Sequence, residues 1–328
     1  MVRFFLCGIA VLSLLISKAR AADTYDQPLV SVSSAIGASA PPAPDGTQVH
    51  LKSIPRFLKR VFMPVLPASS NSFRIEDERI EEVLESPSGF VVQLFDGQVN
   101  ITPQADAVAG YARVRTSERE LQLSIAVLEP YRNVQQGRLN GYRIGEYAAN
   151  PRMGLDSYRL PDGFVPLTEA TKDLWVSDHY RLRDFQCKLD GASKFLVLRP
   201  EALIKLELLQ RKLNQAGVGF ERFTVMSAFR TPFYNSRIGN DTVYSRHLYG
   251  DAMDIYVDRN DDGNMDDINR DGTINQEDAR HLMRVAEEID HSKEWGWLRG
   301  GAGVYRANSA HGPFLHIDVR GYIARWGA

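Results

Sequence analysis

Between residues 71 and 150, apolar and polar residues alternate in short runs. Alternation with a period of two is typical of half-buried β-strands. The clearest runs cover residues 90–95, 112–115 and 121–127. Turn-forming pairs that end in glycine follow these runs, and they are Asp96-Gly97, Gln136-Gly137 and Asn140-Gly141. Such pairs are typical of hairpin turns. We therefore predict a small all-β domain over residues 71–150.

The pattern changes in the C-terminal half, where helical and strand periods are mixed. Residues 200–216 begin with a proline, carry leucines on one face and stop at Gly217, which predicts a helix. A second helix is predicted over 277–289, and a buried strand over 223–226. Residues 232–240 are expected to form a loop.

A late apolar run, residues 314–319, alternates as a half-buried strand does. This spacing places Phe314, His316 and Asp318 on one face of the strand. Mixed helices and strands predict an α+β domain over 169–328. A linker rich in Gly and Pro, residues 151–168, joins it to the β domain.

The N-terminus has the pattern of an export signal. Arg3 precedes an apolar run over residues 4–16, and Ala19-Arg20-Ala21 is a small-x-small cleavage site. The apolar run is short for a membrane span. We predict a signal peptide over 1–21 and a periplasmic or secreted protein without a stable membrane span after cleavage. A retained anchor is the alternative.

Residues 22–70 are expected to be a flexible leader, because their first part is rich in Ser, Ala, Pro and Gly.

The net charge argues against one class of partner, and the cysteine content argues against disulfide bonds. The whole chain has a formal net charge of −2. Removal of residues 1–21 takes away three basic residues and no acid, which makes the charge −5. A mildly acidic chain without a basic block lacks the electrostatic footprint of a nucleic-acid-binding protein. Only Cys187 remains after cleavage, so the mature chain can form no intrachain disulfide.

Two stretches carry candidate metal ligands. His247 and Asp254 bracket a glycine turn, and His316 lies on the late strand. Imidazole nitrogens and carboxylate oxygens are ligands that a catalytic zinc prefers, with three from the protein and one position open to water. We predict a zinc site made by His247, Asp254 and His316. The alternative is that these are ordinary buried or solvated side chains.

A second metal signal follows Asp254. Residues 267–278 place oxygen-bearing side chains at alternate positions around a glycine, as calcium loops of the EF-hand and dockerin types do. The predicted calcium ligands are Asp267, Asn269, Asp271, Thr273, Asn275 and Asp278. An earlier loop from Asp258 is incomplete, because its twelfth position is Asn269. We expect structural calcium in an insertion over 258–278. A solvated acidic loop and a dockerin-like partner module are the alternatives.

The run Ser245-x-His247-x-x-Gly250-x-Ala252-x-Asp254, followed by a late histidine, resembles the zinc D-Ala-D-Ala carboxypeptidases and endopeptidases of bacterial cell walls. Residues 179–187 and 225–232 resemble the same family. The resemblance implies a hedgehog/DD-peptidase fold, with an antiparallel sheet and flanking helices. It also implies zinc-dependent hydrolysis of peptidoglycan peptides near a D-amino acid. By the same resemblance, Ser227, Arg230 and Ser245 would contact substrate, and Arg230 would also meet the charge that develops during attack.

The sequence departs from that family at the general base. Many relatives have a Glu three residues before the last histidine ligand, or a His two residues before it, and here these positions are Pro313 and Phe314. Asp318 and His311 are the remaining candidates, although Asp318 is also placed to orient His316. Relatives that end in His-x-Asp resemble residues 315–321. A catalytically silent cell-wall-binding protein is the competing hypothesis. The β domain would serve in substrate binding or wall attachment.

Overall fold

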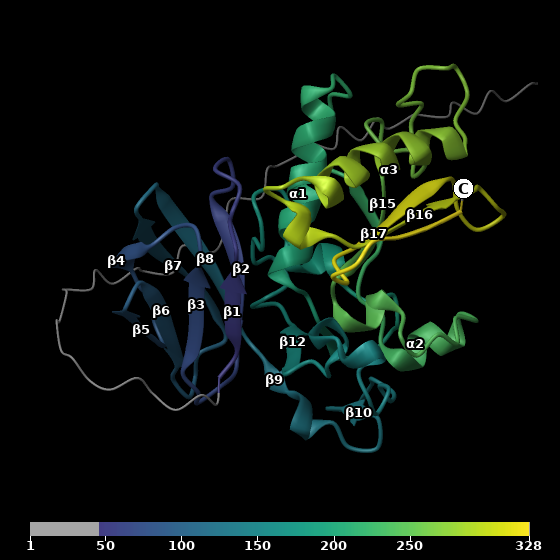
Figure 1. The fold of residues 1–328 in the computed structure, drawn as a ribbon. Helices are drawn as coiled ribbons and strands as arrows, with labels where there is room; N and C mark the ends of the chain where they lie inside the picture. The colour runs from purple at the N-terminus through teal and green to yellow at the C-terminus, as the bar shows by residue number, and fades with distance from the viewer. Residues whose placement is uncertain (1–45, 328) are drawn as a thin grey trace, which may run out of the picture.

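The computed structural model describes residues 46–327, and within them the fold is α+β, as predicted (Figure 1). The predicted signal peptide and most of the predicted leader lie outside the described residues. Two groups of elements are visible in Figure 1. Strands β1 to β8 lie on one side, and the three helices lie with the C-terminal strands on the other. In the described part of the chain, no helix is long and apolar enough to cross a membrane.

Residues 46–127, called here the β-rich region, contain two four-stranded sheets. One sheet has the order β1-β3-β6-β5 and the other has the order β2-β8-β7-β4. Alternating apolar side chains such as Phe73, Ile101, Leu123 and Ile125 are buried in the core. The strands are β1 (Gln48–Leu51), β2 (Arg60–Val65), β3 (Asn71–Ile75), β4 (Ile80–Glu85), β5 (Phe90–Phe95), β6 (Gln98–Pro103), β7 (Ala109–Thr116) and β8 (Glu120–Val127).

The structure corrects the C-terminal end of the predicted leader over 22–70. Strands β1 and β2 fall inside that range, and each pairs in parallel with a later strand, β1 with β3 and β2 with β8. Leu51, Phe62 and Met63 are buried in the core. Partners for these strands come from residues further along the chain, so the local composition of 22–70 gave no sign of the pairing.

Residues 128–199 connect the β-rich region to the C-terminal sheet. This segment has a three-stranded sheet of order β13-β12-β9 and a small hairpin, β10 with β11. The predicted linker over 151–168 therefore ends in a paired strand, β12. The strands are β9 (Glu129–Pro130), β10 (Arg138–Leu139), β11 (Tyr142–Arg143), β12 (Gly163–Leu167) and β13 (Lys194–Leu196).

The C-terminal part is built on a five-stranded sheet of order β14-β15-β17-β16-β18. All neighbouring pairs are antiparallel except β16 with β18, which run parallel. The expected strands over 223–226 and 314–319 correspond to β14 and β17, each shifted or shortened by one residue. The strands are β14 (Thr224–Ser227), β15 (Ala252–Tyr256), β16 (Gly301–Tyr305), β17 (Phe314–Asp318) and β18 (Ala324–Trp326).

Three helices accompany this sheet. Helices α1 (Pro200–Gln215) and α3 (Gln276–His291) agree closely with the two predicted helices and contact each other beside β16 and β17. The expected loop over 232–240 instead begins with helix α2 (Pro232–Arg237). Thr231 caps this helix by accepting a hydrogen bond from the Tyr234 N–H, and Pro232 suits its first turn.

Asn71 ties β1, β2 and β3 together. Its side chain is fully buried and hydrogen-bonds backbone groups of Thr47, Leu66, Ser69 and Ile101. Truncation leaves these buried groups unpaired, each at a cost of about 1–3 kcal/mol.

We therefore expect Asn71→Ala to lower the free energy of unfolding by about 2–4 kcal/mol, measured by denaturant titration. Asn133→Ala, at an exposed position, is the control and should change it by less than about 0.5 kcal/mol. Equal effects of the two substitutions would contradict the assigned role of Asn71.

Candidate metal centre

One row of paired residues crosses all five strands of the C-terminal sheet. Ser227 pairs with Asp254, Asp254 with His316, His316 with Gly303, and Gly303 with Trp326. Paired residues of neighbouring strands point to the same face of a sheet. The row therefore places two of the predicted zinc ligands side by side, on β15 and β17.

The third predicted ligand, His247, comes from the short 3-10 helix η5 (Arg246–Tyr249), which directly precedes β15. Gly250 ends this helix with φ of 70°, and a Cβ there would overlap the backbone carbonyl of Val197. Only glycine suits that position. A buried ion pair between Arg246 and Asp251 holds the same turn, with Nε and Oδ1 3.0 Å apart.

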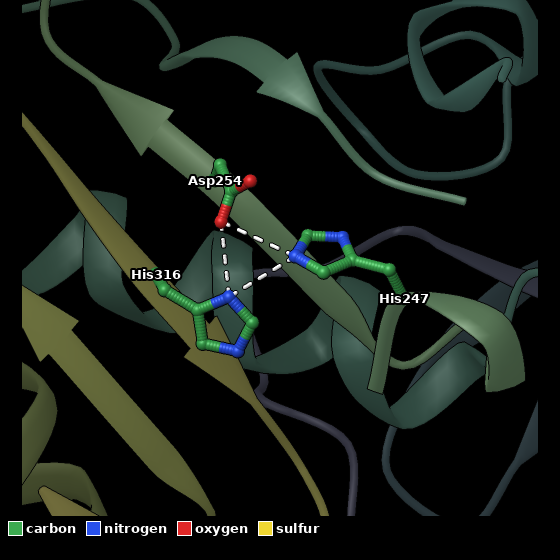
Figure 2. A group of neighbouring side chains, drawn as sticks. All are labelled: His247, Asp254 and His316. Carbon is green, nitrogen blue, oxygen red and sulfur yellow. Dashed lines mark hydrogen bonds and ion pairs between the residues drawn. The ribbon is translucent and has the colours of Figure 1, made fainter. Parts of the chain in front are cut away.

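Three ligand atoms converge in the space between these elements (Figure 2). Asp254 Oδ1 lies 2.9 Å from His316 Nδ1 and 3.3 Å from His247 Nε2, and the two nitrogens are 3.2 Å apart. All three side chains are buried. In a tetrahedral zinc site with bonds of about 2.0–2.1 Å, neighbouring ligand atoms are about 3.3 Å apart. The spacing fits zinc.

Each histidine uses its second ring nitrogen to contact a hydrogen-bond acceptor. His247 Nδ1 lies 2.6 Å from the Ala228 carbonyl, and His316 Nε2 lies 3.1 Å from Asp318 Oδ2. Donation to these acceptors leaves His247 Nε2 and His316 Nδ1 free to face a metal. Metal-binding histidines commonly donate their other N–H to a carbonyl or carboxylate in this way.

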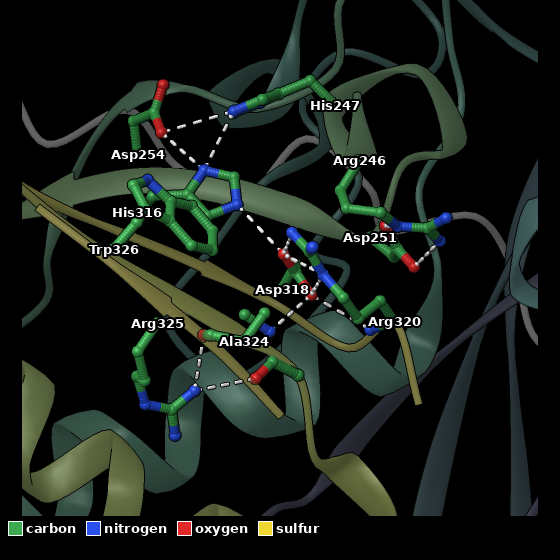
Figure 3. A network of polar contacts seen from close by, with 12 residues as sticks. Arg246, His247, Asp251, Asp254, His316, Asp318, Arg320, Ala324, Arg325 and Trp326 are labelled. Carbon is green, nitrogen blue, oxygen red and sulfur yellow. Dashed lines mark hydrogen bonds and ion pairs between the residues drawn. The ribbon is translucent and has the colours of Figure 1, made fainter. Parts of the chain in front are cut away.

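Asp318 is itself fixed from several sides (Figure 3). Its Oδ1 accepts hydrogen bonds from the Gly301 N–H at 2.7 Å and from Arg320 Nε at 2.9 Å. Behind it, buried Lys205 donates to the Asp318 carbonyl at 3.0 Å and to Asp290 at 2.7 Å. The carboxylate that orients His316 is therefore held rigidly.

Burial and neighbouring charges shift the pKa values of the three side chains in opposite directions. Burial lowers the pKa of His247. Burial also opposes the charged form of His316, but hydrogen bonds to Asp254 and Asp318 outweigh it and raise the pKa. Burial alone would raise the pKa of Asp254, yet the two histidines hold it well below its usual range. Asp254 is thus a carboxylate, as a metal ligand must be.

Among the described residues, these three form the only group of three or more His, Cys, Asp or Glu whose ligand atoms lie close enough to share an ion.

Residues 178–284 match the family model of Peptidase M15. No curated protein matches the chain. The Peptidase M15 match supports the resemblance to zinc D-Ala-D-Ala peptidases. It includes His247 and Asp254, whereas His316 lies beyond it and is placed by the sheet pairing.

Of the residues expected to contact substrate in an M15 peptidase, two adjoin the centre. Arg230 forms an ion pair with Asp254 Oδ2, and its Nε donates to Ser227 Oγ at 2.8 Å. Arg230 therefore places a positive charge at the edge of the centre. Ser245 is the N-cap residue of η5, and its carbonyl accepts a hydrogen bond from the Leu248 N–H.

The two candidates for the general base differ in position. Both oxygens of Asp318 accept hydrogen bonds from neighbours, so its contact with the centre is the one to His316. His311 lies in the turn between β16 and β17, where it contacts Asn308 and the Gly312 carbonyl. Within residues 46–327, no hydrogen bond or ion pair joins His311 to His247, Asp254 or His316.

The carboxylates of the predicted calcium loop are engaged by backbone N–H groups of the loop itself. Asp267 accepts from Arg270 and Gly272, while buried Asp278 accepts from Ile268, Asn269 and Asn275. The three aspartates of the loop do not converge as His247, Asp254 and His316 do. Structural calcium is not supported by this arrangement and stays a prediction. The predicted ligands Asn269, Asp271, Thr273 and Asn275 lie in the same loop, before α3.

Two residues near the centre had no sign in the local sequence pattern. The Trp326 ring lies 5.1 Å from the His316 ring, between centroids, because Gly303 leaves the space beneath it open. Lys205 is a buried charged residue on α1. Both become visible only when distant strands and helices are brought together.

Asp318→Asn tests the orienting role of this carboxylate. The substitution keeps the side-chain shape but removes the charge that Arg320 and His316 face. We expect zinc affinity, measured by competition with a chromophoric chelator, to fall by about 10–100-fold.

Asp156→Asn, an exposed substitution, is the control and should leave zinc affinity unchanged. Equal zinc affinity in Asp318→Asn and wild type, with both proteins folded by circular dichroism, would contradict the role of Asp318 in orienting His316.

Proposed function

We propose that the protein is an exported zinc metallopeptidase that hydrolyses peptide bonds next to D-amino acids in peptidoglycan stem peptides or cross-links. The observation that carries the proposal is the buried triangle of His247, Asp254 and His316. Three protein ligands are typical of catalytic zinc, whereas structural zinc sites have four. The Peptidase M15 match over 178–284 gives independent support for peptidase chemistry.

Zinc held by these residues would polarise the scissile carbonyl and lower the pKa of water toward neutrality. The chain supplies the rest of the site. Ala228 and Asp318 fix the two histidines with their ligand nitrogens facing inward. Arg230, next to Asp254, provides a positive charge for the carbonyl oxygen as negative charge develops on it.

Asp318 acts in this proposal through His316, because its oxygens are already occupied. His311 stays the candidate proton acceptor predicted from the sequence. The positions that carry the base in many relatives, Pro313 and Phe314, have no titratable group. The absence of a base at these two positions favours the second candidate function. This is a catalytically silent cell-wall-binding protein that keeps the zinc ligands.

Export is the part of the proposal that rests on residues 1–21 alone, with their basic start, apolar run and small-x-small site. The mature chain has a single cysteine, which is buried, so its fold is compatible with either redox compartment. Peptidoglycan peptides are the partners that fit an exported peptidase of this type. The β-rich region would then position the catalytic part on the wall.

Hydrolysis of purified muropeptides separates the two candidate functions. We expect the mature protein to cleave stem peptides or cross-links, to lose activity when a chelator removes the metal, and to regain it with zinc. Arg230→Gln should lower kcat/KM by about 10²–10³-fold, since it removes charge stabilisation in the transition state.

Arg237→Gln, which changes an exposed arginine at the end of α2, is the matched control and should retain activity. Zinc-loaded protein that binds muropeptides but leaves them intact would instead establish the silent wall-binding protein.

Calcium binding can be tested without reference to activity. If residues 267–278 bind calcium, the ion should raise the free energy of unfolding by about 2.7 kcal/mol at 100 times its Kd. Asp271→Ala should abolish that increase, whereas Asp262→Ala, in the incomplete first loop, should not. An unfolding curve that calcium does not move in wild type would show a solvated acidic loop.

A further inference from the structure

A groove of about 460 Å³ runs along the outer side of β14. β14 is an edge strand, because the sheet order begins with it. All four of its residues, Thr224–Ser227, are half-buried, so the strand is accessible from the groove. The rest of the lining comes from residues between 180 and 188, together with residues 194, 222, 223 and 228.

The groove is lined by more positive than negative charge. Four basic side chains line it, Arg183, Lys188, Lys194 and Arg222, against one carboxylate, Asp184. This excess stands out in a chain whose formal net charge is −2.

Part of this positive charge is free for a ligand. Arg222 pairs with Asp184 at 2.8 Å, and Arg183 pairs with Asp173. The two lysines have no acidic partner among the described residues, and Lys194 Nζ donates to the neutral side chain of Gln186 at 3.4 Å. A positively charged, partly enclosed groove attracts anionic ligands.

One end of the groove adjoins the metal centre. Ser227 and Ala228 line the groove. Ser227 Oγ accepts a hydrogen bond from Arg230, which is paired with Asp254, and the Ala228 carbonyl contacts His247. A chain lying in the groove therefore reaches the ligands after passing β14.

We propose that this groove is the subsite for an acidic segment of the substrate peptide, located to one side of the bond cleaved at the metal centre. The proposal rests on the proposed peptidase function for the position of that bond. The binding itself requires only the groove and its lysines.

The geometry fixes where the acid must be. Asp254 lies one strand away from β14 and His316 two strands away, at about 4.8 Å per strand. β14 thus lies about 5 Å from the strand that carries Asp254 and about 10 Å from the strand that carries His316. An extended peptide advances at most about 3.3–3.6 Å per residue, so the carboxylate belongs two or three residues from the scissile bond.

The test uses a rhodamine-labelled peptide whose scissile amide is N-methylated to resist hydrolysis, with glutamate at the second and third residues from that bond. A second peptide has glutamine there. Fluorescence anisotropy is measured with the zinc-loaded mature protein, with Lys188→Glu/Lys194→Glu, and with Lys52→Glu/Lys293→Glu. The last protein has the same change in net charge at exposed positions outside the groove.

We expect wild type and the control double variant to bind the glutamate peptide at least about fivefold more tightly than the glutamine peptide. Lys188→Glu/Lys194→Glu should lose this preference, and high salt should reduce it in wild type. Moving the two glutamates to positions beginning at the sixth residue from the scissile bond should also abolish the preference for glutamate. Equal affinity of wild type for the two peptides, or equal losses in both double variants, would overturn the proposal.

Hydrolysis of the unmodified peptide separates the two proposals. If wild type cleaves it and the groove variant and control have the same kcat/KM, the groove inference fails and the peptidase function stands. If binding depends on the groove lysines but no protein cleaves the peptide, the groove stands and the peptidase function fails.

Discussion

The metal centre depends on keeping a buried carboxylate and two buried imidazoles within about 3 Å of one another. Burying an unpaired carboxylate costs several kcal/mol, so Asp254 needs compensating contacts. Arg230 and the two histidines provide them on the protein side. The glycine turn at Gly250 and the pairing of β15 with β17 provide the geometry. Loss of any of these contacts leaves the buried charge of Asp254 less compensated, which costs stability.

Compensation extends outward from the ligands into the body of the fold. His316 is held by Asp318, Asp318 by Arg320 and Gly301, and the Asp318 carbonyl by Lys205. Lys205 is on α1, and its other partner, Asp290, is on α3. The helices thus reach the site through a chain of buried polar contacts. Such a chain makes the ligands rigid before any metal arrives, which is the preorganisation that catalysis by a metal requires.

The grouping of His247, Asp254 and His316 could be predicted because they lie in two short patterns, a glycine turn at Gly250 and an alternating strand over 314–319, and because these patterns resemble the motif of a known family. The α+β class and helices α1 and α3 followed from periodicity in the same way. The pairings of β1 and β2 could not be predicted, because parallel strands find their partners far along the chain. For the same reason, neither the position of Trp326 beside His316 nor the basic groove could be predicted, because the residues that form them come from separate segments.

Elemental analysis of the purified mature protein, wild type beside His247→Ala, tests the central claim most directly. We predict one zinc per chain in wild type and none in the variant, with both proteins folded by circular dichroism. His247 contributes a ligand nitrogen, so its removal leaves two protein ligands, too few for a stable zinc site. Zinc absent from folded wild type even after incubation with the metal, or retained at one per chain in the variant, would contradict it.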